Sequence, residues 1–298
     1  MTVSPPRPSA LRAWVLAIRW RTLSAAVAPV LVGSGLAIHD GTFHLPSALA
    51  ALAAALCIQI GTNLANDLHD FRRGADARRV GPTRVVAAGL LSPQAVQRGT
   101  ILCFGLALII GTALVLRGGW PIVAIGLAAI AAGYTYTAGP LPLAYHGLGD
   151  LAAFLFFGVI GVCGMYYLHA LAWSPWALLA SLPVAALVTN ILIVNNLRDL
   201  PGDRVVGKRT LAVILGPRGA RLEFLALLAL AYLVPPLFAL SGRSSWFVLA
   251  PWLTLPLALP LTARVLQHDE ARVLNPALVR SSQLLLLFSL LFALGLAL

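Results

Sequence analysis

Charged residues are scarce in this chain. Asp, Glu, Lys and Arg make up only 10% of its 298 residues, whereas 59% are hydrophobic. The mean hydropathy of +0.88 is far above that of soluble domains, in which about 25% of residues are charged. This shortage of charge excludes a soluble globular domain.

Cysteine is equally sparse. The three cysteines, Cys57, Cys103 and Cys163, lie within apolar runs, are odd in number and match no metal-ligand spacing. We therefore expect them to be buried packing residues. The first residues contain prolines and arginines but no small-residue cleavage site after an apolar core, so we expect no removable signal peptide.

Acidic residues number only ten, against 21 Lys and Arg, which gives a formal net charge of +11. In a soluble protein such an excess would indicate nucleic-acid binding. Here the apolar composition makes membrane topology the better explanation, because cytoplasmic loops of membrane proteins collect Lys and Arg. We expect contact with membrane lipids and no nucleic-acid partner.

Long windows without charge locate the membrane spans, since about 20 apolar residues cross the hydrocarbon core. The sequence predicts an all-α integral membrane protein with nine transmembrane helices. We expect a single domain, 1–298, made of two four-helix halves, about 18–138 and 150–264, and a ninth helix. The expected helices are 18–38, 46–66, 97–116, 120–138, 150–171, 176–197, 219–241, 245–264 and 280–298.

The basic residues support this topology. With nine spans, all but two of the 21 Lys and Arg residues fall on one side of the membrane, and only Arg117 and Arg243 fall on the other. This bias predicts a cytoplasmic N-terminus in a bacterial inner membrane. The acids share the basic side, except for Asp40.

Polar residues gather after the second expected span, in the run Asn63-Leu-Ala-Asn-Asp-Leu-His-Asp70. On a helix, Asn63, Asn66, Asp67 and Asp70 share one face within an arc of about 100°. A charge that faces lipid is costly, so this face is expected to border a polar cavity or a cation.

A second cluster follows the sixth expected span and repeats the Asn-x-x-x-Asp spacing 132 residues later. We expect Pro201 and Gly202 to interrupt the helix before Asp203. Because the clusters are four helices apart, they open on the same side of the membrane and can converge. The members of this cluster are Asn195, Asn196, Asp199 and Asp203.

Carboxylate and amide oxygens without a His or Cys spacing suit a hard cation such as Mg²⁺. The neighbouring arginines would repel a bare cation but bind a diphosphate. At a membrane surface this combination indicates a lipid diphosphate, best a prenyl diphosphate whose C1–O bond can ionise. A divalent-cation or anion transporter is a second interpretation, favoured by the internal repeat. The position of the acids at the membrane surface argues against it.

The chain resembles the UbiA-type membrane prenyltransferases. Asn66-Asp67-x-x-Asp70 and Asp199-x-x-x-Asp203 are similar to the two aspartate-rich motifs of that superfamily. The resemblance extends from residue 19 to about residue 216. Three further runs resemble the 1,4-dihydroxy-2-naphthoate branch: Arg79-Val-Gly-Pro-Thr-Arg84, Tyr145-His-Gly-Leu-Gly-Asp150 and Gly207-Lys-Arg-Thr-Leu-Ala-Val213.

The resemblance implies transfer of a polyprenyl group from polyprenyl diphosphate to 1,4-dihydroxy-2-naphthoate, with loss of CO₂ and diphosphate, to give demethylmenaquinone. It also implies Mg²⁺ dependence, with two ions bridging the diphosphate. The third acid of the first motif usually follows four residues after the second, where this chain has Gly74, and Asp76 comes two residues later. A branch that uses 4-hydroxybenzoate or another aromatic acceptor is an alternative.

The candidate residues fall into three groups, all expected on the cytoplasmic side. Expected Mg²⁺ ligands are Asp67, Asp70, Asp76, Asp199 and Asp203. Expected substrate-binding residues are Arg21, which would pair with the acceptor's carboxylate, and Asn63, Asn66, Arg72, Arg73, Arg84, Asn195, Asn196, Lys208 and Arg209. Expected catalytic residues are the acids Asp67, Asp70, Asp199 and Asp203, Tyr134 and Tyr136 for contact with the carbocation or the acceptor, and Tyr145, His146 and Asp150 for deprotonation.

Overall fold

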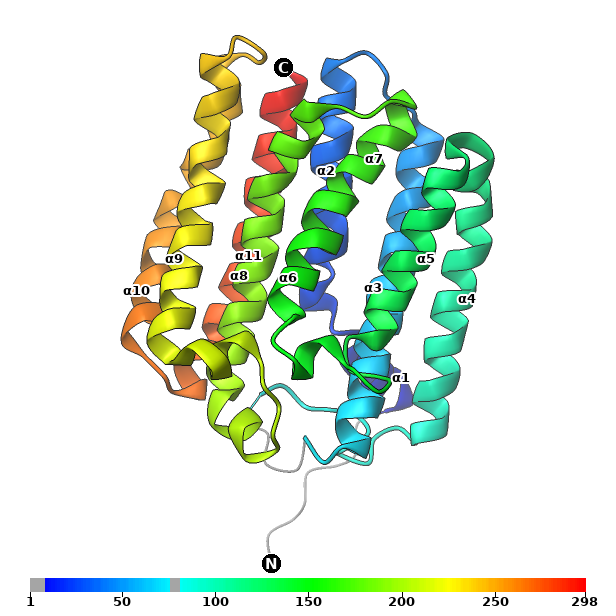
Figure 1. The fold of residues 1–298 in the computed structure, drawn as a ribbon, viewed down its shortest axis with the longest axis vertical. Helices are drawn as coiled ribbons and strands as arrows, with labels where there is room; N and C mark the ends of the chain where they lie inside the picture. The colour runs from blue at the N-terminus through cyan, green and yellow to red at the C-terminus, as the bar shows by residue number, and fades with distance from the viewer. Residues whose placement is uncertain (1–8, 76–80) are drawn as a thin grey trace, which may run out of the picture.

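The computed structural model describes residues 9–75 and 81–298, and helices dominate it. A short helix, α1 (Ala10–Ile18), precedes a bundle of long helices that lie side by side (Figure 1). The long helices are α2 (Ser24–His39), α3 (Leu45–Arg72), α4 (Pro93–Gly118), α5 (Trp120–Thr135), α8 (Pro175–Val205), α9 (Leu211–Leu240) and α11 (Ala271–Ala297), and α9 is kinked at Gly216, whose φ is +71°.

The other rods of the bundle are built from consecutive helical segments. One runs through α6 (Gly149–Ala153), the π-helical η3 (Phe154–Ile160) and α7 (Gly161–Ala170), and another through η4 (Trp246–Thr254) and α10 (Leu255–Gln267). Two short 3-10 turns, η1 (Trp20–Thr22) and η2 (Leu143–Tyr145), lie in the connections.

The number of spans can be compared with the expectation of nine. Within the described residues, seven helices are long and apolar enough to cross a membrane, or eight if the pair Ala10–Thr22 and Ser24–His39, bent by 45°, forms one broken span. The expected span 120–138 corresponds to α5, which is apolar but has only 16 residues. The all-α membrane architecture is confirmed, and the count of nine stays a prediction.

Helices α3 and α8 extend further than expected, to Arg72 and Val205, so both polar clusters lie on regular helix. The expectation that Pro201 and Gly202 interrupt α8 is wrong. Pro201 lacks the N–H that would bond to the Leu197 carbonyl, but the loss of this one hydrogen bond does not end the helix, which continues to Val205. Asp199 and Asp203 are therefore one turn apart on the same helix.

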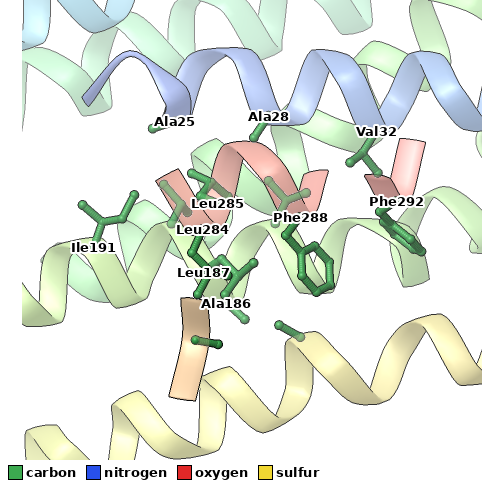
Figure 2. Close-up of a cluster of buried hydrophobic side chains, with 14 of the residues drawn as sticks. Ala25, Ala28, Val32, Ala186, Leu187, Ile191, Leu284, Leu285, Phe288 and Phe292 are labelled. Carbon is green, nitrogen blue, oxygen red and sulfur yellow. The ribbon is translucent and has the colours of Figure 1, made fainter. Parts of the chain in front are cut away.

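The core of the bundle lies around α8 and α11. Helix α11 lies between α2 and α8, and Figure 2 shows Leu285 and Phe288 of α11 in a cluster with Ala28 of α2 and Leu187 of α8. Small residues allow close crossings: a Cβ added to Gly35 of α2 would overlap Ala293 of α11. This core places the C-terminal ends of α3 and α8 at the same end of the bundle (Figure 1).

The opposite end of the bundle, where the chain ends, carries the three charges that were expected on the far side of the membrane (Figure 1). Asp40 after α2 pairs with Arg243 after α9, and it also accepts a 2.6 Å hydrogen bond from the Tyr166 hydroxyl. Arg117 donates to the backbone oxygens of Leu168 and His169 at the end of α7. These charges connect helix ends and leave the polar clusters of α3 and α8 at the other end.

Candidate active site

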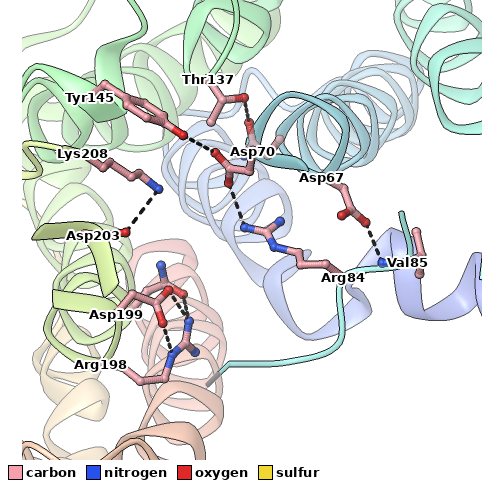
Figure 3. A network of polar contacts seen from close by, with 12 residues as sticks. Asp67, Asp70, Arg84, Val85, Thr137, Tyr145, Arg198, Asp199, Asp203 and Lys208 are labelled. Atoms are coloured by element: carbon pink, nitrogen blue, oxygen red, sulfur yellow. Dashed lines mark hydrogen bonds and ion pairs between the residues drawn. The ribbon is translucent and has the colours of Figure 1, made fainter. Parts of the chain in front are cut away.

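The polar clusters of α3 and α8 meet, and Tyr145 lies between them (Figure 3). The Tyr145 hydroxyl donates a 3.0 Å hydrogen bond to Asp70 Oδ1 of α3. On the other side, Lys208 Nζ lies 5.3 Å from the centre of the Tyr145 ring and 4.0 Å from Asp203 Oδ1 of α8. The convergence that the sequence predicts is therefore present at one end of the bundle.

Three of the four polar residues of α3 face the same cavity. Asn63, Asn66 and Asp70 line it, and Asn66 Oδ1 accepts a 2.9 Å hydrogen bond from Thr137. Asp67 lies outside that lining and accepts a 3.0 Å hydrogen bond from the backbone N–H of Val85. Because the four residues spread over an arc of about 100° on the helix, some of them face the cavity while Asp67 faces the connection between α3 and α4.

Arg84 completes the cluster of α3. It belongs to the connection between α3 and α4, and its guanidinium lies 3.1 Å from Asp70 Oδ2. The side chains of Arg84 and Asp70 are only 7% and 2% exposed, so their interaction is weakly screened by water. The same connection was singled out in the sequence by the run that ends at Arg84.

The cluster of α8 contains a buried ion pair that the sequence analysis did not anticipate. Arg198 binds both carboxylate oxygens of Asp199, at 2.8 and 2.7 Å. The Arg198 side chain is fully buried and also donates to Asn195 of α8 and Asn275 of α11. Asp199 therefore contributes to the attachment of α11, whereas Asp203, one turn further, faces Lys208.

A cavity of about 760 Å³ opens from this polar end into the bundle. Near its mouth it is lined by Asp70 and Arg84 together with the predicted residues Asn195, Asn196, Lys208 and Tyr136. Deeper in, small and aliphatic side chains line it, among them Ala26, Ile58, Leu114, Ile122 and Leu168. The cavity thus combines a polar, cation-rich mouth with an apolar interior.

Three more expected residues, Arg73, Arg209 and His146, lie at the rim of the site. Arg73 donates a 2.8 Å hydrogen bond to the Gly139 carbonyl and lies over the Tyr145 ring at 4.9 Å. Arg209 pairs through its backbone with His146, whose Nδ1 lies 2.9 Å from the Pro142 carbonyl oxygen. The connection between α5 and α6 is therefore attached to the end of α3 and to the segment between α8 and α9.

Other expected residues lie away from the cavity lining. Arg21 lies over the ring of Trp20, and Arg72 bonds to Gln97 at an exposed position. Tyr134 is 43% exposed and contacts His69 edge-on. Asp76 lies outside the described residues. The remaining expected residue, Asp150 of α6, is 3% exposed, and within the described chain its Oδ2 has no hydrogen-bond partner.

One lining residue of the cavity, Arg19, was not expected from the sequence. Arg19 lines the cavity, although the sequence favoured Arg21. Arg19 has φ +54° at the break between α1 and η1, and Asn63 donates to Ile18 and Thr22 on either side of it. A left-handed residue inside a helical pattern carries no compositional signal, so only the fold places Arg19.

Burial and the nearby Asp70 carboxylate raise the pKa of the Tyr145 hydroxyl above its ordinary value. Burial is the larger cause, and the hydrogen bond to Asp70 acts in the same direction because it requires the proton. Tyr145 is therefore a hydrogen-bond donor to Asp70 in this structure.

The donor set fits a hard cation that is shared with a ligand. Among the described residues, no three His, Cys, Asp or Glu side chains form a complete metal cage. Mg²⁺ seldom needs such a cage, because it keeps waters and usually binds one or two carboxylates together with substrate phosphates. Asp70 and Asp203, on opposite sides of Tyr145, provide carboxylates of that kind.

The comparison with known proteins agrees with this arrangement. Residues 26–284 match the UbiA prenyltransferase family. The chain belongs to the UbiA prenyltransferase family. The family expected from the two aspartate-rich motifs is thus confirmed, over a range that also includes most of the C-terminal helices.

Curated members of the family are similar over nearly their whole length. The chain is 37% identical over 286 residues to the 1,4-dihydroxy-2-naphthoate octaprenyltransferase of Mycobacterium tuberculosis, with 95% of this chain and 96% of that protein covered. It is 36% identical over 298 residues to the 1,4-dihydroxy-2-naphthoate octaprenyltransferase of Escherichia coli, with 96% of each covered.

A solved structure of a UbiA homolog from Archaeoglobus fulgidus, bound to GPP and Mg²⁺, shares the fold. Its TM-score with this chain is 0.66 at 17% sequence identity, and 94% of this chain and 99% of that chain are covered. At this identity the likeness concerns the arrangement of the helices.

Proposed function

We propose that this UbiA-family chain transfers a polyprenyl group from polyprenyl diphosphate to 1,4-dihydroxy-2-naphthoate, with release of CO₂ and diphosphate. The observation that carries the proposal is the single cavity that joins a polar mouth, where the two acidic clusters meet, to an apolar interior. The names and high coverage of the relatives from Mycobacterium tuberculosis and Escherichia coli support the same acceptor.

Asp70, which lines the mouth, and Asp203, which lies beside the lining residue Lys208, would hold Mg²⁺, and Asn66 would add an amide oxygen from the cavity wall. When bound, Mg²⁺ neutralises the diphosphate and makes it a better leaving group. Asp199 would join this set only by giving up part of its contact with Arg198. Asp76 remains a proposed ligand from the sequence.

Basic side chains at the mouth would hold the diphosphate. Arg84 and Lys208 line the cavity, and each already pairs with one of the proposed ligand carboxylates. A guanidinium binds phosphate oxygens in a fixed, bidentate geometry, whereas an ammonium acts as a compact point charge. Their charge favours breaking of the C1–O bond, because the electron pair leaves with the diphosphate.

The prenyl chain would occupy the apolar interior, and the allylic cation would form near Tyr136. An aromatic ring stabilises a cation over its face. The ring carbon of the acceptor that bears the carboxylate would attack C1 of the prenyl group. The C–COO⁻ bond then breaks, CO₂ leaves, and the electron pair of that bond restores the aromatic ring.

A proton must leave the acceptor's hydroxyl during attack and return after CO₂ leaves. Asp150 is the proposed acceptor of this proton, because it is a buried carboxylate with an oxygen that has no partner among the described residues. Its neighbour Gly149 packs on Tyr136, where an added Cβ would lie 3.0 Å from the tyrosine hydroxyl. His146, on the same connection, is the second candidate.

We also propose nine spans with a cytoplasmic N-terminus and a cytoplasmic active site in the bacterial inner membrane. Counting the bent pair and the 16-residue α5 as crossings supports the number. The Lys and Arg bias supports the orientation, and the repeat of the Asn-x-x-x-Asp spacing after 132 residues supports the two pseudo-repeat halves. Reporter fusions at the loops test the topology.

The function is tested by incubating the purified chain in detergent with Mg²⁺, a polyprenyl diphosphate and 1,4-dihydroxy-2-naphthoate. The expected products are prenylated, decarboxylated quinol and diphosphate. Parallel incubation with 4-hydroxybenzoate tests the other branch, and its sole conversion would overturn the proposed acceptor. Substrate uptake into proteoliposomes without any prenyl transfer would instead support a transporter.

A further inference from the structure

Asp67 lies three residues before Asp70 in α3 but has a different neighbour. Its Oδ2 accepts the hydrogen bond from the Val85 N–H, whereas Asp70 faces Tyr145 (Figure 3). Asp70 also lines the cavity. Asp67 is 1% exposed, and it is absent from the cavity lining within the described residues. Its carboxylate is thus directed at the connection between α3 and α4 rather than at the mouth.

The residue that Asp67 holds is the neighbour of Arg84. We call residues 81–92 the Arg84 loop. Val85 is fixed there at three points: its side chain is fully buried among Leu64, Leu68 and their neighbours, its N–H binds Asp67, and its carbonyl accepts from Leu90 N at 2.9 Å. Because Arg84 directly precedes Val85, these attachments fix the backbone position from which the Arg84 side chain extends.

We propose that Asp67 is a positioning residue that anchors the Arg84 loop through the Val85 N–H and acts on the substrate's diphosphate only through Arg84. The inference rests on the proposed function, in which Arg84 binds the diphosphate. It assigns Asp67 a role different from the Mg²⁺ ligation that the motif alone favours.

Asparagine and alanine at position 67 separate the two roles. Asparagine keeps a side-chain oxygen that accepts from the Val85 N–H but loses the negative charge with which a carboxylate ligand attracts Mg²⁺. Alanine removes the acceptor and leaves a buried N–H without it. A positioning role therefore predicts rescue by the conservative variant D67N, whereas a ligand role predicts equal damage from both.

The experiment measures two equilibria on the full chain in detergent: binding of Mn²⁺ alone, by electron paramagnetic resonance, and binding of a prenyl diphosphate with Mg²⁺, by calorimetry. We expect D67A to weaken diphosphate binding about tenfold and D67N by no more than about threefold. Both should bind Mn²⁺ like the original chain, whereas D70N, the matched substitution at a proposed ligand, should lose Mn²⁺ binding.

A double-mutant cycle tests whether the effect passes through Arg84. If it does, D67A adds nothing to the loss already caused by R84Q. Loss of Mn²⁺ binding in D67N would overturn the proposal in favour of a ligand role. Unchanged diphosphate binding in D67A would also overturn it, because burial of Val85 would then suffice to place the loop.

Two further results remain decisive. If D67A does not fold, D67N decides alone: retained Mn²⁺ and diphosphate binding support the anchor, and loss of either overturns it. If the original chain binds a prenyl diphosphate but does not prenylate 1,4-dihydroxy-2-naphthoate, the proposed function fails while the role of Asp67 is still measured.

Discussion

The hydroxyl of Tyr145 donates a 3.0 Å hydrogen bond to Asp70 Oδ1, while the ring of the same side chain lies 5.3 Å from Lys208 Nζ. The hydroxyl of Tyr145 thus contacts the cluster of α3, and the face of its ring lies near Lys208, which pairs with Asp203 of α8. One residue from the connection between α5 and α6 links two helix ends that are far apart in the sequence.

Replacement of Tyr145 by Phe tests this link. The ring remains beside Arg73 and Lys208, but Asp70 loses a donor. A hydrogen bond to a charged group contributes about 1.5–3 kcal/mol, so kcat/KM should fall by about ten- to a hundredfold. Steady-state kinetics measure the loss. Y145L removes the ring as well and should be worse, and an equal effect of the two variants would show that the ring contributes nothing.

The pH dependence of Y145F gives a separate prediction. Because burial and Asp70 raise the pKa of Tyr145, its hydroxyl keeps its proton beyond the ordinary range of tyrosine, about pH 10. Tyr145 is then neutral at every pH where the enzyme works, and the alkaline side of the rate profile should have the same shape with Tyr or Phe. An alkaline limb that disappears in Y145F would mean that Tyr145 titrates in the reaction.

The positions of Asp70 and Asp203 at one end of the bundle could be predicted from the sequence, because their signal is local. Regular spacing on a helix places Asp70 and Asp203 on definite faces, and the count of helices between them places both at one membrane side. The same reasoning found the all-α architecture, since long charge-free windows have few alternatives. It was less exact at helix ends, where Pro201 did not act as the expected break.

Contacts between distant segments left no comparable signal. In the sequence, Arg198 is one of many arginines expected on the basic side of the membrane. Only the fold shows that α11 places Asn275 Oδ1 3.2 Å from its guanidinium. Asp67 resembles Asp70 in the motif, but a partner 18 residues away determines which way it faces. Arg19 enters the cavity through a left-handed break that no composition indicates.

Loss of charge at Asp70 or Asp203 should abolish activity. Asp70 lies at the mouth beside Arg84 and Asp203 lies beside Lys208, and an amide cannot neutralise Mg²⁺ in the same way. D70N and D203N should lower kcat by about a thousandfold or more, in the range seen when a main electrostatic group is removed. D269N is the matched control, since Asp269 is 72% exposed and pairs with Arg221 at the surface. Near-normal rates in D203N would remove the α8 cluster from the mechanism.

Substitution of Asp199 should reduce stability as well as activity. D199A leaves the fully buried Arg198 without its carboxylate, and breaking such a pair typically costs about 3–5 kcal/mol. Thermal unfolding in detergent should show a large drop for D199A and a smaller one for the double variant R198M/D199L, which leaves no isolated charge. If D199A is inactive but as stable as the original chain, Asp199 acts at the substrate rather than in the attachment of α11.

The apolar depth of the cavity should set the length of the prenyl chain that the enzyme accepts. Gly126 of α5 lines the cavity, and no side chain or backbone atom lies within 4 Å of a Cβ added there. It is ten residues before Tyr136, about 15 Å deeper along the helix. A larger side chain at Gly126 would therefore occupy the space of the distal isoprene units without touching the mouth.

We expect G126L to lower kcat/KM for octaprenyl diphosphate by about tenfold or more while changing that for geranyl diphosphate little, because a short chain does not reach this depth. Gly105 of α4 provides the control: it is also helical, its added Cβ also meets nothing within 4 Å, and it does not line the cavity within the described residues. G105L should leave kcat/KM for both donors unchanged. If G126L lowers kcat/KM equally for long and short donors, the prenyl chain lies outside this cavity. Only a prenyl chain that lies along α5 would make the effect of G126L depend on donor length.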